Sequence, residues 1–169
     1  DGGAVVTNNK KIYETIIKLR THGANKKFKH ELIGVNSRLD TIQAAVLSNK
    51  LKRIDKINNL KRKIAKIYFE KITNKKIYLF DIPNSSCFHQ FVILVNKRKH
   101  FINYLKKFNI PYGFHYPYAI HKLKAFKQHS NDKKLKNSEI IAKQCISLPI
   151  DPNINKKKLN YIIDKINHY

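Results

Sequence analysis

The chain has 169 residues, a mass of 19.9 kDa and a formal net charge of +24 at pH 7, with 42% hydrophobic residues. This hydrophobic content argues against a disordered chain, and no apolar run is long enough to span a membrane. The charge suggests nucleic-acid binding. However, Arg supplies only 5 of the 35 basic residues, and the lysines are scattered along the chain. An AT-rich coding sequence explains this composition more simply, so we expect no nucleic-acid partner.

The two cysteines, Cys87 and Cys145, belong to no Cys-x-x-Cys motif and to no His-rich cluster. We therefore expect free, buried thiols in a reducing compartment, the cytoplasm, and no metal site. Methionine is absent and the sequence begins with Asp1-Gly2-Gly3, so we expect a partial product or part of a longer polypeptide.

The chain opens with an apolar segment, residues 4–7, which predicts a short strand. Asn8 and Asn9 are suited to cap the following helix, and Thr21-His22-Gly23 is expected to end it. Residues 24–32 are rich in Lys and are expected to form a solvated surface loop. A strand followed by a helix is typical of an α/β layer structure.

A polar turn, Gly34 to Asp40, then leads into an amphipathic helix. Residues 38–73 contain no Pro or Gly, and their apolar positions recur at steps of three and four. This spacing predicts one helix about 50 Å long. Such a helix suits a strut between two lobes, which we expect at residues 1–73 and 74–169.

The remainder of the chain alternates strand and helix patterns, which predicts a small α/β lobe. The strongest strand pattern is FHQFVILV, residues 88–95. The expected strands are residues 77–80, 88–95 and 110–116; the expected helices are residues 97–109, 119–127, 138–145 and 156–167; and residues 147–150 are expected to be extended.

A polar cluster lies in Gly113-Phe114-His115-Tyr116-Pro117, and His121 follows shortly after it. An imidazole and a phenol beside a turn fixed by proline can recognise a sugar or a phosphate. Each of these residues alone is more often structural, and Pro117 holds Tyr116 extended without any functional reason.

Four separated segments together resemble the DegT/StrS family of pyridoxal-phosphate (PLP) dependent sugar aminotransferases, and the resemblance spans essentially the entire chain. It implies an α/β fold, the C-terminal part of a PLP-dependent transferase of fold type I, with the end of the large domain, a long linking helix and a small α/β domain. The segments are Asp1-Gly2-Gly3-Ala4 with the valine pair after it, the run from Gly34 to Leu47 (GVNSRLDTIQAAVL), His115-Tyr116-Pro117 with the later His121, and Ser147-Leu148-Pro149 before the last helix.

The resemblance implies transfer of an amino group from an amino acid, commonly glutamate, to a keto-sugar nucleotide during biosynthesis of amino sugars and surface polysaccharides. PLP is the implied cofactor, and the implied active site is shared between the subunits of a homodimer. The Schiff-base lysine would lie upstream of Asp1, so we assign no catalytic residue within the chain and expect it to be inactive alone. The motif spellings are slightly closer to family members acting on 3-keto than on 4-keto sugars.

The family's site residues can be placed on matching positions of this chain. Asn36 would contact the PLP phosphate of the partner subunit, and Arg38 would bind a carboxylate or diphosphate of the sugar nucleotide as a bidentate fork. His115 and Tyr116 would line the substrate pocket. His89 and His121 are weaker candidates, nearer to structural residues.

Two alternatives remain open from the sequence. The chain could be a non-catalytic relic or dimerisation fragment, which would fail to bind PLP even when mixed with an intact homologue. It could also be a basic nucleic-acid-binding module, whose binding would collapse with salt.

Overall fold

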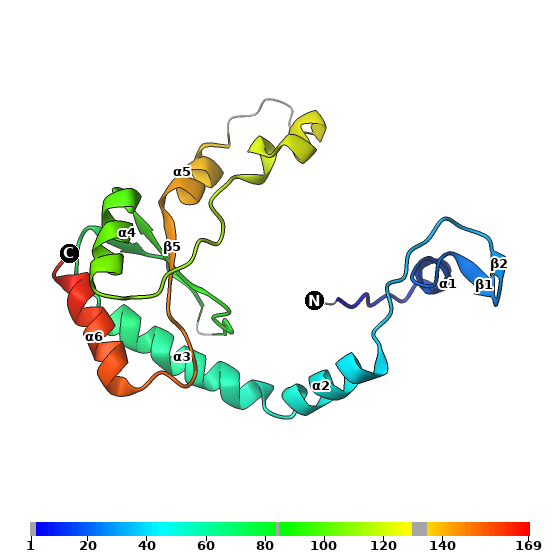
Figure 1. Ribbon diagram of the computed structural model, residues 1–169, viewed down its shortest axis with the longest axis horizontal. Coiled ribbons are helices and arrows are strands. Elements are labelled where there is room, and N and C mark those ends of the chain that lie inside the picture. Colours follow the sequence, from blue (N-terminus) through cyan, green and yellow to red (C-terminus); the bar gives the residue numbers. More distant parts are fainter. Residues whose placement is uncertain (1–2, 84, 130–134) are drawn as a thin grey trace. The chain divides into compact units, whose positions relative to one another are not determined.

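The computed structural model describes residues 3–83, 85–129 and 135–169 and shows a mixed α/β protein (Figure 1). The chain divides into two compact units, which we call the N-terminal unit (Asp1–Arg53) and the C-terminal unit (Ile54–Tyr169). The division falls within the segment that the sequence predicted to be a single helix. A boundary between functional domains at residues 73 and 74 stays a prediction.

The N-terminal unit begins with helix α1 (Lys10–Leu19), as predicted. Asn9 caps this helix, because its side-chain oxygen accepts a hydrogen bond from the Ile12 backbone N–H at 3.2 Å. The strand predicted at residues 4–7 is wrong, because these residues form none. Residues 25–32 are exposed, as expected of a surface loop, but the segment contains an antiparallel pair, β1 (Ala24–Lys26) and β2 (Lys29–His30).

Gly23 permits the close approach of the chain that leaves this hairpin at Leu32. Its φ is +75°, and a Cβ atom at this position would lie 1.6 Å from the backbone oxygen of Leu32. Only glycine fits both the backbone conformation and the space.

The predicted long helix is broken into α2 (Thr41–Leu51) and α3 (Ile54–Lys71), so the prediction of one uninterrupted helix is wrong. The Arg53 N–H donates to the Lys50 oxygen, three residues back, at 3.0 Å. A bond of this type tightens the last turn and ends the regular α-helical ladder. Without Pro or Gly, the apolar periodicity gave no signal of this break.

The C-terminal unit contains an antiparallel sheet of three strands in the order β3-β4-β5, namely β3 (Ile77–Leu79), β4 (Phe91–Val95) and β5 (Cys145–Leu148). In the central strand β4, alternate side chains are buried, as expected for a strand with one face toward a core. The pairing sets Ile77 opposite Val95 and Phe91 opposite Leu148.

Helices α3, α4 (Arg98–Lys107) and α6 (Lys156–Asn167) pack with the sheet in one hydrophobic core, to which Ile72, Phe88, Ile110 and Ile150 of the connecting segments also belong. Asn155 caps α6 by accepting from the Lys158 N–H at 2.8 Å. The largest fully buried side chains of this core are Tyr68, Phe91, Phe101, Ile93, Leu105, Ile146, Ile162 and Ile166.

The segments between α4 and α6 differ from their predictions. Residues 110–116 form no strand among the described residues, and only Gly113 pairs with the sheet, opposite Ser147. The helix expected at residues 119–127 is two 3₁₀ helices, η1 (Ile120–Lys122) and η2 (Lys124–His129). Helix α5 (Lys136–Gln144) ends one residue earlier than expected, because Cys145 already belongs to β5.

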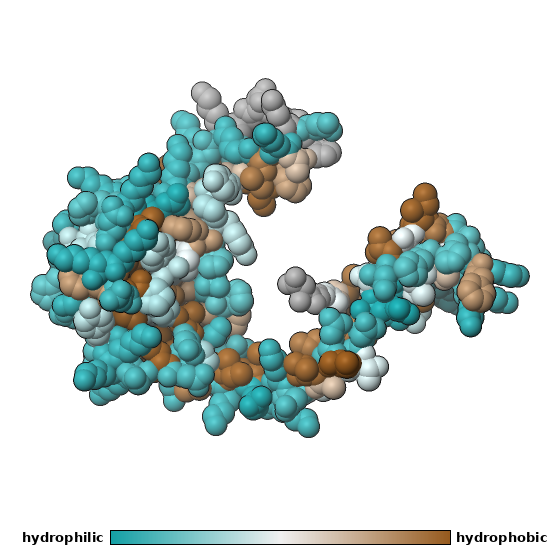
Figure 2. Space-filling view, in the orientation of Figure 1, coloured by the Kyte–Doolittle hydropathy of each residue, from teal (hydrophilic) through white to brown (hydrophobic). Residues whose placement is uncertain are grey.

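The thiols are free, as expected, and Cys145 is buried, but Cys87 is exposed, which corrects the prediction that both are buried. Between residues 3 and 53, Gly23 is the one described residue that is buried. Large apolar side chains of this unit are accordingly exposed, and Figure 2 shows hydrophobic surface along α2.

Candidate functional site

The two predicted site residues of the N-terminal unit, Asn36 and Arg38, lie in the extended segment that leads into α2. Backbone hydrogen bonds attach this segment to the end of α1: the Val35 N–H donates to the Leu19 oxygen at 2.9 Å and the Ser37 N–H to the Arg20 oxygen at 2.9 Å. The backbone around Asn36 is therefore fixed, while the side chain is exposed.

Asn36 and Arg38 contact each other. The Nε of Arg38 donates to the Oδ1 of Asn36 at 3.2 Å. Because a guanidinium can only donate, this bond sets the orientation of the Asn36 amide. Its Nδ2 group is thereby left to donate elsewhere, and an anionic oxygen such as that of a phosphate is a suitable acceptor.

The other predicted site residues, His115 and Tyr116, lie in the C-terminal unit. The Nδ1 of His115 is 2.7 Å from the Oγ of Ser147, and the backbone of Gly113 exchanges hydrogen bonds of 3.1 and 2.8 Å with Ser147. The neighbouring Tyr116 side chain is 72% exposed, and its ring centroid lies 5.3 Å from that of His115. A small hollow of about 260 Å³ is lined by His115 and Ser147, together with Gln90, Pro111, Tyr112, Gly113, Leu148, Pro149 and Ile150.

Ser147 is a candidate that the sequence reasoning missed. It is the one buried polar residue recorded among the described residues, and its hydroxyl holds the His115 imidazole. The sequence marked this position only as part of an extended Ser-Leu-Pro segment. Its pairing with His115, 32 residues earlier, carries no local sequence signal.

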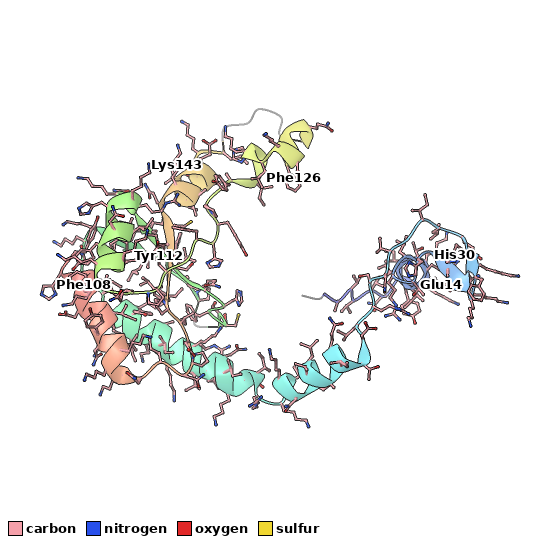
Figure 3. The ribbon with its side chains drawn as sticks, viewed as in Figure 1. Glu14, His30, Phe108, Tyr112, Phe126 and Lys143 are labelled. Carbon is pink, nitrogen blue, oxygen red and sulfur yellow. The ribbon has the colours of Figure 1, made fainter. Side chains whose placement is uncertain are left out.

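A larger groove begins at Tyr116 and has a volume of about 880 Å³. One side is formed by the segment from Tyr116 to Leu123 and by Phe126 of η2 (Phe126 is labelled in Figure 3). The other side is formed by Leu135 and α5. The lining is mainly aliphatic and aromatic, as is common for sites that bind small organic molecules.

The two weaker candidates differ. His121 lies in the larger groove, where its Nε2 is 3.1 Å from the Oε1 of Glu139, whereas His89 is exposed. Glu139 also pairs with Lys122 at 3.4 Å. The hydrogen bond from His121 is the main cause that lowers the pKa of Glu139, and the charge of Lys122 adds to it.

The structure thus brings Asn36 together with Arg38, and His115 together with Tyr116, each pair within its own unit. Across residues 3–83, 85–129 and 135–169, there is no cluster of three His, Cys, Asp or Glu side chains arranged to bind a metal ion. Within the same ranges, we find no helix with the length and apolar character needed to cross a membrane.

Comparisons with known proteins agree with the resemblance of the motifs. The dTDP-3-amino-3,6-dideoxy-alpha-D-galactopyranose transaminase of Aneurinibacillus thermoaerophilus is 37% identical over 170 residues, which are 99% of this chain and 47% of that protein. The UDP-2-acetamido-2-deoxy-3-oxo-D-glucuronate aminotransferase of Pseudomonas aeruginosa is 30% identical over 167 residues, 96% of this chain and 45% of that protein. The chain thus spans about half the length of the curated relatives that it matches.

Solved structures show the same fold. The crystal structure of DesV from S. venezuelae superposes with a TM-score of 0.86 at 29% identity, covering 96% of this chain and 45% of DesV. Helicobacter pylori PseC, an aminotransferase, gives a TM-score of 0.81 at 26% identity, covering 95% of this chain and 46% of PseC. These matches confirm the predicted class, a partial PLP-dependent transferase of the α/β type.

A family model covers nearly the entire sequence, residues 1–167. Together with the motifs around Asn36 and His115, this match shows that the chain belongs to the DegT/DnrJ/EryC1/StrS aminotransferase family.

Proposed function

We propose that this chain is the C-terminal part of an aminotransferase that moves an amino group from an amino acid, glutamate by preference, to the keto group of a sugar nucleotide. The product would be an amino sugar for a surface polysaccharide. The observation that carries the proposal is the match of almost the full chain to proteins named as transaminases of dTDP- and UDP-linked sugars. Among these names, 3-amino and 3-oxo sugars predominate, which favours a 3-keto substrate.

The described residues fit the phosphate end of PLP, the family's cofactor. Asn36 presents an amide whose oxygen is already bonded to Arg38, so that its Nδ2 group can donate to a phosphate oxygen. When bound, PLP supplies the electron sink for chemistry at the amino carbon. We assign Asn36 the task of orienting the phosphate, in the active site of a partner subunit of a homodimer.

Substrate binding is assigned to Arg38, His115 and Tyr116. Arg38 is exposed and offers paired N–H donors, which suit a carboxylate or a diphosphate. The His115 imidazole is held on one side by Ser147, so its other ring nitrogen can form a hydrogen bond with a sugar hydroxyl or keto oxygen. The exposed Tyr116 ring adds an apolar face and a phenol.

We place the enzyme in the cytoplasm. The resemblance assigns the Schiff-base lysine to the region that precedes Asp1 in an intact family member. No Lys of this chain is given that role.

A chimera tests the proposal directly. This chain would replace the matching C-terminal segment of the Aneurinibacillus relative, and amine transfer to a dTDP-linked 3-keto sugar would be measured. Activity that falls by about 100-fold with Arg38→Ala in the chimera supports the proposal. A chimera that folds but neither binds PLP nor transfers an amine would support the alternative of a non-catalytic relic.

A further inference from the structure

The segment that carries His115 and Tyr116 runs alongside the segment formed by α5 and β5, and polar contacts join the two. The partners occur in opposite order along the two segments, so the two segments run antiparallel. The contacts are Gly113 with Ser147, His115 with Ser147 at 2.7 Å, the Cys145 Sγ with the Tyr116 backbone oxygen at 3.3 Å, and His121 with Glu139 at 3.1 Å.

The contact at the far end, between His121 and Glu139, is sheltered from solvent. The side chain of His121 is 12% exposed and that of Glu139 is 26% exposed. Another His–carboxylate pair of the same unit, His168 with Asp164 at 3.2 Å, is 73% and 48% exposed. Water screens such an exposed pair strongly, whereas the sheltered pair retains more of its attraction.

Two tyrosines between the two ends of this row of contacts project outward. Tyr116 and Tyr118 are 72% and 70% exposed. The larger groove lies between this stretch and α5, and His121 is part of its lining. At the start of this stretch the Tyr116 backbone oxygen accepts from the Cys145 Sγ, and at its end His121 and Lys122 both contact Glu139.

We propose that His121 and Glu139 are positioning residues, which join η1 to α5 and thereby hold Tyr116 and Tyr118 in place along the groove. The role at the substrate rests on the proposed function, because Tyr116 is a proposed substrate contact. The joining itself is independent of substrate. Two charged groups face the His121 imidazole: Glu139 from α5, and Lys122 of η1, which shares the Glu139 carboxylate.

Amide hydrogen exchange of the full chain tests the joining. His121→Ala is expected to increase exchange of residues 116–122 about tenfold, because a sheltered charged hydrogen bond is lost. Glu139→Gln, which also removes the ion pair with Lys122, should increase exchange as well, and the double variant should give less than the sum of the two single effects, because both changes weaken the His121–Glu139 interaction. His168→Ala is the matched control and should leave residues 116–122 unchanged. Unchanged exchange in His121→Ala, additive effects, or an equal increase in β4 and α6 would overturn the proposal.

A conservative variant gives a second readout that simple packing would not produce. His121→Gln keeps an N–H donor that can reach the Glu139 carboxylate, so it should retain part of the protection of residues 116–122 that His121→Ala loses. Equal loss of protection in His121→Gln and His121→Ala would reject the hydrogen bond. Neither measurement needs substrate or cofactor, so its failure is separate from failure of the chimera.

Discussion

The hydroxyl of Tyr68, in α3, donates a hydrogen bond of 2.8 Å to the backbone oxygen of Pro149, the residue that follows β5. The Tyr68 side chain is fully buried, and its ring packs against Phe91 with the centroids 4.8 Å apart. One bond thus connects the helix that enters the C-terminal unit to the strand that carries Ser147.

Replacing this tyrosine should measure the strength of that connection. Tyr68→Phe leaves the Pro149 oxygen without its partner in an apolar environment, and we expect the free energy of unfolding to fall by about 1–2 kcal/mol. Urea denaturation would give the value. Tyr78→Phe, at a position 59% exposed, is the control and should change the free energy by less than about 0.5 kcal/mol. Equal effects of the two changes would contradict the assigned role.

The buried Tyr68 should also lower the free energy of unfolding at alkaline pH. Burial raises the pKa of Tyr68 above its ordinary value of 10.0. The folded state therefore keeps this proton at a pH where the unfolded chain releases it, so stability is unaffected below about pH 10 and falls above it. Denaturation between pH 9 and 11.5 should show a steeper loss in the wild type than in Tyr68→Phe. Parallel curves would rule out this contribution.

Glu139 contributes to the loss of folding stability at acid pH. The hydrogen bond from His121 is the largest cause that lowers the pKa of Glu139, followed in effect by the Lys122 charge. A lowered pKa stabilises the folded state above the ordinary value of 4.5, and this contribution is lost as the pH falls toward the folded-state pKa. Carboxyl-carbon NMR should show the Glu139 titration moving up toward 4.5 in His121→Ala. A titration midpoint that does not move would exclude His121 as the cause.

The N-terminal unit should exchange its amide hydrogens quickly. Within residues 3–53 only Gly23 is buried, so little apolar burial offsets the entropy of ordering α1 and α2. We expect amides of α1 and α2 to exchange within minutes at pH 7, while those of β4 and α6 stay protected for much longer. Strong protection of α2 would instead show that another surface covers its apolar side chains in solution.

Ser147→Ala should affect the candidate site more than the fold. It removes the group that lies 2.7 Å from the His115 Nδ1, so the ring loses the bond that fixes its orientation. In imidazole NMR spectra the His115 signals should shift and broaden, while those of the exposed His168 stay unchanged. Unaltered His115 signals would show that Ser147 does not orient this ring.

Local patterns in the sequence predicted those parts of the structure that depend on local physics. The helical spacing of apolar residues located α1, α4 and α6. The apolar run predicted β4 at residues 91–95, although residues 88–90 of the expected strand are not part of it. Asn9 was expected to cap α1 and does so. The motif around Asn36 and Arg38 indicated the family that the comparisons confirm.

Features that depend on distant contacts were not predictable in this way. The end of α2 is made by a bond from the Arg53 backbone N–H to the Lys50 oxygen, which any residue except proline could donate. Residues 110–116 are apolar enough for a strand, but only Gly113 finds a pairing partner, and Pro111 has no N–H to donate. The partnership of His115 with Ser147 arises only when the chain has folded.

The register of β5 has a consequence for how this protein can vary. Side chains alternate along a strand, so a slip of β5 by one residue against β4 would turn the Ser147 hydroxyl to the opposite face and detach it from His115. An inserted or deleted residue within Cys145–Leu148 would therefore remove the Ser147 contact of His115 and also displace buried side chains of β5 from the core. Length changes are better tolerated in η2, which contributes no strand to this sheet.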